Sequence, residues 1–210
     1  MRTGVIIGIL AMGAVVAASN VLVQFLYGDW LTLGAFTYPF AFLITDIVNR
    51  IYGARDAQKV VFAGFLVGLL CSAIGTQIEG EFGPLVSARV AIGSGIAFLI
   101  AQLTDILIFN RLRSGAWWRA PLASTVIGSA IDTGLFFAIA FSAGFAFIAP
   151  SVDVGWANEI VPLLGSGPEA PLWVSLAIAD FGVKLGIALI ALVPFRLCVN
   201  AILNRSQRPA

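Results

Sequence analysis

Six long apolar stretches, separated by clusters of charged residues, proline or glycine, make up most of the chain. A helix that crosses the hydrocarbon core of a bilayer needs about 20 predominantly apolar residues. The stretches of this length lie at about residues 5–26, 30–48, 60–78, 86–109, 122–148 and 172–198. The pattern therefore predicts an all-α membrane protein, with residues 1–210 forming a single six-transmembrane-helix bundle.

The first apolar stretch follows Arg2 and could be read as a signal peptide. Its apolar run extends from about Gly4 to Leu26, whereas the apolar core of a signal peptide usually has about 7–15 residues. We therefore expect a first helix that is retained in the protein.

Lysine and arginine residues gather at alternate ends of the predicted helices. Because cytoplasmic loops of membrane proteins are enriched in basic residues, this distribution indicates orientation. With the N-terminus inside, the cytoplasmic side collects Arg2, Arg50, Arg55, Lys59, Arg111, Arg113, Arg119, Arg196, Arg205 and Arg208. The outer side then holds one basic residue, Arg89, and the acidic residues Asp29, Glu79, Glu81, Asp153, Glu159 and Glu169. The separation predicts that both termini lie in the cytoplasm.

The composition agrees with a lipid environment and narrows the chemistry. Hydrophobic residues make up 60% and charged residues 11% of the 210 positions, and the mean hydropathy is +0.98. A soluble domain has about 45–50% apolar and about 25% charged residues. The net charge of +1 gives no indication of nucleic-acid binding, no histidine is present, and Cys71 and Cys198 have no metal-site spacing. Enzyme motifs are also absent, so we predict no catalytic residue, metal site or cofactor.

One loop is long, and it is rich in proline. Residues 149–171 lie on the predicted outer side and include Trp156. The segment could be an interfacial connector with an aromatic anchor, or a lid over a site that faces outward.

Several ionisable or amide side chains fall inside the predicted helices. A charge at the centre of a membrane helix costs at least about 2.5–3.5 kcal/mol, so such residues usually face a partner or a cavity. Asp180 and Lys184 are four residues apart and lie on one helix face. They could form a structural ion pair, or they could take part in a substrate or proton site.

Asp132 lies deep in the fifth predicted helix, on one stripe with Thr125, Gly128 and Ser129. Small and hydroxylated residues favour close helix packing, but a carboxylate at this depth favours a position facing a cavity.

Gln102 and Asp105 share a face of the fourth predicted helix. Asp105 lies about one turn from the inner boundary and could simply reach the interface, whereas the deeper Gln102 needs a partner. Asp46, at the inner end of the second helix, could interact only with Asn49, Arg50 or loop backbone.

Three sequence motifs resemble those of the queuosine precursor transporter family, also described as vitamin uptake transporters. Residues 37–53 read T-Y-P-F-A-F-L-I-T-D-I-V-N-R-I-Y-G, which is similar to the family pattern T-Y-P-x-x-F-L-x-T-D-x-x-N-E-x-Y-G. Residues 101–106 and 124–133 are similar to its S-Q-x-x-D-V and S-T-x-x-S-Q-x-x-D-T motifs. The resemblance covers most of the chain from about Phe36.

Some departures from the family motifs change polar residues. Arg50 replaces a typical glutamate, Gly128 a serine, and Ser129 a glutamine. The motif aspartates are kept as Asp46, Asp105 and Asp132. If the replaced groups contact the substrate, the departures change the ligand or its affinity.

The resemblance implies import of a 7-deazaguanine, 7-cyano-7-deazaguanine or its aminomethyl form, across a bacterial inner membrane. It also implies a likeness to the substrate-binding subunits of energy-coupling-factor importers, which would require partner subunits, while a small stand-alone carrier could work as a homodimer. A membrane-embedded enzyme or assembly protein is the remaining alternative. The residues expected to line or adjoin the substrate site are Gln102, Asp105, Ser129, Asp132, Asp180 and Lys184, and those expected to gate or order its inner end are Asp46, Asn49 and Arg50.

Overall fold

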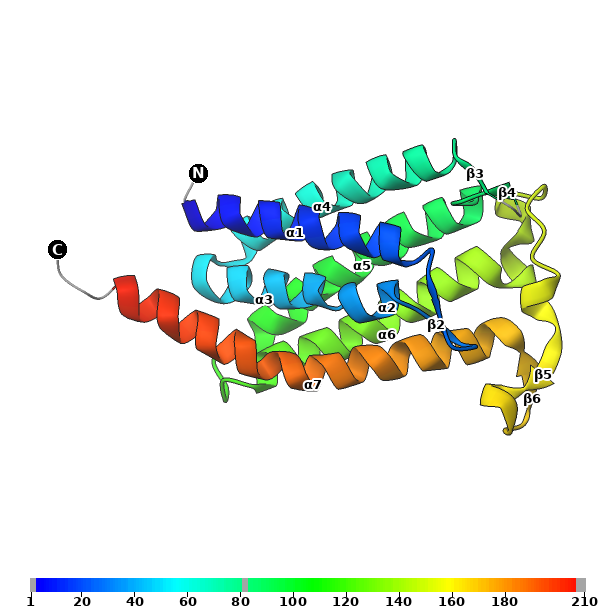
Figure 1. Cartoon of the computed structure of the whole chain (residues 1–210). Helices are drawn as coiled ribbons and strands as arrows, with labels where there is room; N and C mark the ends of the chain where they lie inside the picture. Colours follow the sequence, from blue (N-terminus) through cyan, green and yellow to red (C-terminus); the bar gives the residue numbers. More distant parts are fainter. Residues whose placement is uncertain (1–2, 81–82, 207–210) are drawn as a thin grey trace.

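The computed structural model describes residues 3–80 and 83–206 as a bundle of helices with short connections at both ends (Figure 1). Arg2, Glu81 and Arg208, which contribute to the charge prediction, lie outside the described residues, as does the side chain of Arg205. The long helices are α1 (Thr3–Leu22), α3 (Phe40–Tyr52), α4 (Ala54–Gly75), α5 (Ala88–Leu112), α6 (Arg119–Phe141) and α7 (Leu172–Ser206). The short elements are β1 (Leu26–Tyr27), β2 (Leu31–Thr32), α2 (Gly34–Thr37), β3 (Glu79–Gly80), β4 (Gly83–Pro84), η1 (Ala143–Ile148), η2 (Trp156–Asn158), β5 (Ile160–Pro162), η3 (Leu163–Gly165) and β6 (Glu169–Pro171).

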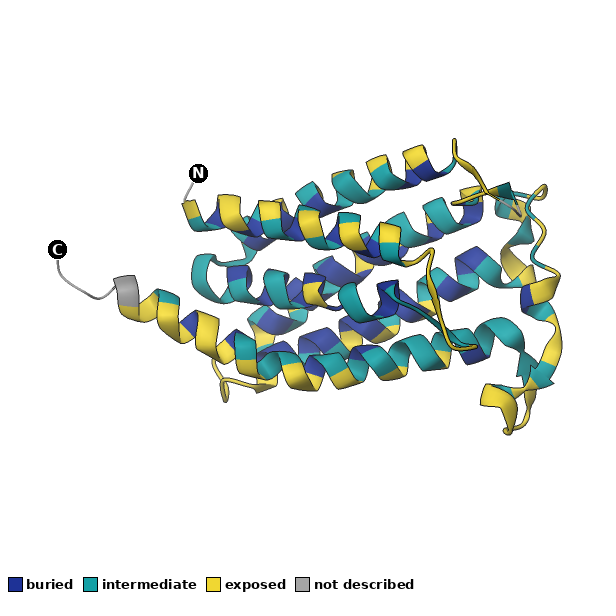
Figure 2. Ribbon diagram, in the orientation of Figure 1, coloured by how far each residue is buried: buried dark blue, intermediate teal, exposed yellow. Residues whose placement is uncertain are grey.

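Five helices of the described chain, α1, α4, α5, α6 and α7, are long and apolar enough to span a membrane. The helices are exposed along their outward faces (Figure 2). Large apolar side chains are among the most exposed residues, with Leu10, Leu70 and Ile190 between 64% and 71% exposed. Since such a surface would be unfavourable in water, the structure confirms an all-α membrane protein.

The second predicted helix, residues 30–48, differs from the prediction. It is not continuous: its first residues belong to the β1–β2 hairpin, and the helical part is divided into α2 and α3 by a break at Tyr38 and Pro39. Proline has no N–H to donate within a helix, and its ring crowds the preceding turn. The two pieces follow one another along the bundle (Figure 1), and residues 34–52 would extend about 28 Å as helix, close to the thickness of the hydrocarbon core.

Three further helices begin or end at other residues than predicted. α4 begins at Ala54, because the chain reverses at Gly53, whose φ of 90° suits glycine. α6 ends at Phe141, and residues 143–148 form the separate 3₁₀ helix η1. α7 continues past the predicted end at 198 to Ser206, beyond the other helices (Figure 1). These shifts leave the order of the helices unchanged.

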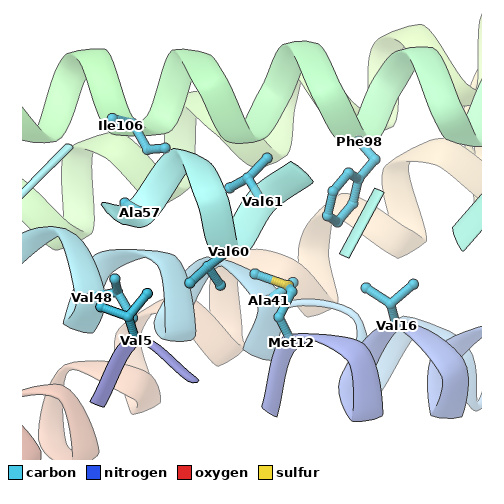
Figure 3. Packing of buried hydrophobic residues seen from close by; sticks show 10 residues of the cluster. All are labelled: Val5, Met12, Val16, Ala41, Val48, Ala57, Val60, Val61, Phe98 and Ile106. Atoms are coloured by element: carbon cyan, nitrogen blue, oxygen red, sulfur yellow. The ribbon is translucent and has the colours of Figure 1, made fainter. Parts of the chain in front are cut away.

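The apolar core lies where α1, α3, α4 and α5 meet. Val5 and Met12 of α1 pack with Val48 of α3, Val60 of α4 and neighbouring side chains, all of them buried (Figure 3). α1 begins and α7 ends at the same end of the bundle (Figure 1). This arrangement suits the predicted orientation with both termini inside, which stays a prediction.

Arg89, the single basic residue of the predicted outer side, is completely buried at the start of α5. Its guanidinium group donates hydrogen bonds to the carbonyl oxygens of Ile139 and Ser142. The last carbonyls of a helix have no partner within the helix, so Arg89 caps the C-terminal end of α6 from a neighbouring helix.

The proline-rich segment 149–171 is folded onto the ends of α6 and α7. The Asn158 side chain donates to the carbonyl of Phe141 and accepts from the N–H of Ala143. Trp156 packs edge-on against Phe141, with ring centroids 5.7 Å apart. These local contacts favour a connector with an aromatic anchor over a lid.

Gly34 is expected to be intolerant of any side chain. A Cβ atom there would lie 3.0 Å from the Ser19 carbonyl oxygen and from two backbone atoms of Val23, and backbone cannot rotate away. We expect Gly34→Ala to lower the free energy of unfolding by about 1–3 kcal/mol, measured as thermal stability in detergent. Gly134→Ala in α6, whose Cβ would meet no atom within 4 Å, is the control and should leave stability unchanged or slightly higher. Equal stability of the two variants would contradict the close approach of α1 and α2.

Candidate functional site

The interior of the bundle holds an ion cluster formed by α6 and α7. The Lys184 ammonium lies 2.7 Å from an Asp132 carboxylate oxygen and 2.6 Å from an Asp180 oxygen, and it donates to the Thr133 hydroxyl at 2.9 Å. The Lys184 and Asp132 side chains are only 4% and 5% exposed. The pairing of Asp180 with Lys184 was predicted from their spacing and is confirmed, but Lys184 also binds a carboxylate of another helix.

Tyr38 connects this ion cluster to the break between α2 and α3. Its hydroxyl donates to the second oxygen of Asp132 at 3.0 Å, and its ring centroid lies 5.3 Å from the Lys184 nitrogen. Tyr38 was not among the predicted site residues, because a tyrosine in an apolar stretch does not by itself indicate a binding site. The signal that could have found it is its place in the T-Y-P motif directly before the helix break.

A second cluster of polar side chains lies where α3, α5 and α6 meet. The Asp46 carboxylate accepts hydrogen bonds from Ser124 at 3.3 Å and Thr125 at 3.2 Å. The carboxyl group of Asp105 lies next to that of Asp46, and both residues are at most 2% exposed. The interpretation of Asp46 as a purely local residue is therefore wrong, since its partners come from α5 and α6.

Gln102 and Asn49 extend this polar cluster along α3 and α5. The Thr45 hydroxyl donates to the Gln102 carbonyl oxygen at 2.6 Å, and the Asn49 amide donates to the backbone of Ile106 at 3.4 Å. Within the described chain, several buried atoms here have no hydrogen-bond partner: Gln102 Nε2, both carboxylate oxygens of Asp105, Ser129 Oγ and Asn49 Oδ1. Native proteins leave few buried polar atoms unpaired, so these residues are the candidate ligand-binding groups of the bundle.

The predicted stripe on α6 runs from the ion cluster to the polar cluster around Asp46. Thr125, Gly128, Ser129 and Asp132 are all buried. A Cβ atom on Gly128 would lie 2.8 Å from the Phe42 ring and 3.4 Å from Asp105 Cβ. The glycine that replaces the family's serine thus lets α3 and α5 approach α6 closely.

Arg50 lies apart from the other predicted residues. It donates to the Arg113 carbonyl at 2.7 Å, and Arg113 donates back to the Arg50 carbonyl at 3.3 Å. Arg50 therefore connects the ends of α3 and α5 by hydrogen bonds. It lies outside the buried polar cluster that contains Asp46 and Asn49.

A crevice between α3, α6 and α7 reaches Asp46 and Thr125. Its volume of about 10 Å³ is close to the minimum for one water molecule, so a planar bicyclic ligand could not enter this crevice. The chain is thus packed closely around this part of the polar interior.

A helical bundle with an apolar exterior and a closed polar interior is typical of a small multi-pass membrane protein. The comparison with protein families agrees: the model of the vitamin uptake transporter family matches residues 32–199. The chain belongs to this family, which confirms the resemblance found in its motifs.

The chain is similar to queuosine precursor transporters over most of its length. It is 34% identical to the "Queuosine precursor transporter" of Escherichia coli (strain K12), with 91% of this chain and 84% of the relative covered. It is 33% identical to the "Probable queuosine precursor transporter" of Haemophilus influenzae (strain ATCC 51907 / DSM 11121 / KW20 / Rd), with 92% and 85% covered. A Bacillus subtilis (strain 168) relative with the same printed name is 27% identical, with 87% and 77% covered. No solved structure matches the chain.

Proposed function

We propose that this protein imports a queuosine precursor, 7-cyano-7-deazaguanine or 7-aminomethyl-7-deazaguanine, across a bacterial inner membrane. The observation that carries the proposal is the set of unpaired polar atoms on one face of α5. Asp105 offers carboxyl oxygens whose neighbours are Asp46 and Ser124, and Gln102, three residues earlier, offers an amide nitrogen without a partner, all buried. In this proposal the protein acts as a transporter and has no enzymatic role or cofactor.

The hydrogen-bonding pattern of Asp105 and Gln102 complements the edge of a guanine ring. That edge presents an N–H, an adjacent amino group and a carbonyl oxygen. A carboxylate accepts the two donors in a bidentate pair, which is a strong charge-assisted interaction, and an amide N–H donates to the carbonyl. Ser129, whose hydroxyl is also unpaired, would contribute a further bond.

The ion cluster suits the substituent at position 7. One ammonium group, Lys184, faces the carboxylates of Asp132 and Asp180, so the cluster has one negative charge in excess. An aminomethyl group is cationic at neutral pH and would balance this charge, whereas a nitrile would accept a hydrogen bond only by drawing Lys184 or Tyr38 away from a present contact with Asp132. Asp46 and Asn49 would order or gate the inner end, and Arg50 would hold α3 to α5.

A competition assay tests the recognition of the guanine edge. Cells that cannot synthesise the precursor, expressing this protein, are given labelled 7-cyano-7-deazaguanine, and uptake is measured against unlabelled competitors. We expect the competitor without the 2-amino group to compete about 10-fold less well than the parent compound, since one Asp105 oxygen would stay buried and unpaired. Absence of any uptake would contradict the proposed function, and equal competition would contradict the role of Asp105.

Reconstitution separates a self-sufficient carrier from a subunit of an energy-coupling-factor importer. Liposomes that contain only this protein should take up the precursor if it works alone or as a homodimer. Substrate binding without uptake would favour the alternative, in which ATPase partner subunits drive import and the ligand could be another vitamin or purine-like compound.

A further inference from the structure

A second pocket lies at the end of the bundle where α3 and α7 meet the turn between α5 and α6. Its volume is about 200 Å³, far larger than the crevice beside Asp46. Its lining comprises Arg50, Trp117, Phe195, Arg196, Val199, Asn200 and Leu203. With the exception of Arg50, none of these residues takes part in the proposed recognition or gating of substrate.

Two arginines give the pocket a basic wall. The Arg196 guanidinium lies 4.6 Å from the ring centroid of Trp117, which holds it by a cation–π contact. Arg50 uses one donor for the Arg113 carbonyl. A guanidinium group has five N–H donors, and no other hydrogen bond from Arg50 is found in the described part of the chain. Two fixed guanidinium groups beside one cavity favour an anionic ligand with several oxygens, such as a phosphate.

Apart from Asn200, the remaining wall of the pocket is apolar, and α7 carries further exposed apolar residues. Phe195 and Val199 form a buried floor, while Val193 and Leu197 on the outer side of the same helix are 62% and 65% exposed. A soluble phosphate would gain nothing from this surface, whereas the acyl chains of a phospholipid would cover it.

We propose that this pocket binds the headgroup of an anionic phospholipid, with its phosphate between Arg50 and Arg196 and its chains along α7. The pocket lies at the end of the bundle that carries Arg55, Lys59 and Arg111, the end expected to meet the anionic cytoplasmic leaflet. Basic pockets between helices at this level are suited to such headgroups.

Fluorescence quenching tests the assignment, because Trp117 lines the pocket. In a variant that keeps Trp117 and carries Trp30→Phe, Trp118→Phe, Trp156→Phe and Trp173→Phe, quenching by brominated phosphatidylglycerol is compared with quenching by brominated phosphatidylcholine in mixed vesicles. We expect a preference for phosphatidylglycerol that falls about fivefold with either Arg50→Glu or Arg196→Gln. Arg111→Gln removes an exposed charge from the same end and should retain the preference.

Lipid retained by the otherwise unchanged chain provides a second measurement that does not depend on the tryptophan substitutions. Phosphatidylglycerol should remain bound through detergent purification and be lost from the Arg50→Glu protein, and mass spectrometry of the purified proteins detects it. Equal quenching by the two lipids, together with no retained phosphatidylglycerol, would overturn the proposal. Displacement of the lipid by millimolar inorganic phosphate would instead identify a soluble anion as the ligand and overturn the lipid assignment. Neither readout requires uptake, so the result is independent of the proposed transport function.

Discussion

Replacement of Lys184 by methionine is expected to prevent the protein from accumulating in a folded form. The substitution nearly preserves side-chain volume but leaves Asp132 and Asp180, which lie 2.7 and 2.6 Å from the ammonium, without a counter-ion. Removal of one partner from a buried ion pair costs about 3–5 kcal/mol, a large part of a typical total stability of about 5–15 kcal/mol. Size-exclusion chromatography and thermal unfolding in detergent measure the effect.

Two further variants show whether the loss comes from uncompensated charge. Lys59→Met breaks an ion pair with Asp56 in which the lysine side chain is 57% exposed, and exposed pairs contribute little, so this variant should fold normally. Lys184→Met combined with Asp132→Asn and Asp180→Asn removes the stranded charges and should recover folded protein without recovering uptake. A stable Lys184→Met protein would contradict the buried triad.

The double substitution Asp105→Asn with Asp132→Asn is expected to reduce uptake of labelled 7-cyano-7-deazaguanine to background while the protein still folds. Asparagine keeps the size of each side chain but replaces an acceptor oxygen by a donor. A hydrogen bond to a charged group contributes about 1.5–3 kcal/mol, so each substitution should lower uptake at low substrate concentration about 10-fold or more, and independent effects add.

Asp29→Asn is the matched control, since Asp29 is exposed in the β1–β2 turn. Uptake by this variant should equal that of the wild type. Size-exclusion profiles must show that the double variant is present and folded in equal amount. Uptake near the wild-type level in the double variant would remove Asp105 and Asp132 from the substrate site and leave them as structural groups.

The positions of the long apolar helices could be predicted from hydropathy, because hydropathy depends on composition averaged over many residues. The break at Pro39 did not, since a missing backbone N–H leaves the average hydropathy of residues 30–48 unchanged. The contact between Asp180 and Lys184 could be predicted because it lies within one helix and depends only on spacing. The contact between Asp132 and Lys184 depends on how α6 and α7 pack, which no local pattern encodes.

The buried polar positions were visible in the sequence, but their partners were less so. Asp46 was expected to interact with nearby residues or loop backbone, yet its hydroxyl donors are Ser124 and Thr125 of α6. Serine and threonine are common in tightly packed membrane helices, so nothing in their local sequence marks them as partners of a carboxylate. The role proposed for Gln102 and Asp105 depends on which of their atoms stay unpaired, and only coordinates reveal that.

The position of Tyr38 gives the break between α2 and α3 a consequence for selectivity. Tyr38, which donates to Asp132, comes just before Pro39 and the start of α3 at Phe40, so its side chain can turn away without unwinding α3. In the proposed substrate site, a ligand group that reaches Asp132 would take the place of the Tyr38 hydroxyl. A cationic aminomethyl group would replace the tyrosine hydroxyl as the donor to Asp132, whereas a nitrile would have to draw that hydroxyl away from the carboxylate, so the two precursors would engage Tyr38 differently.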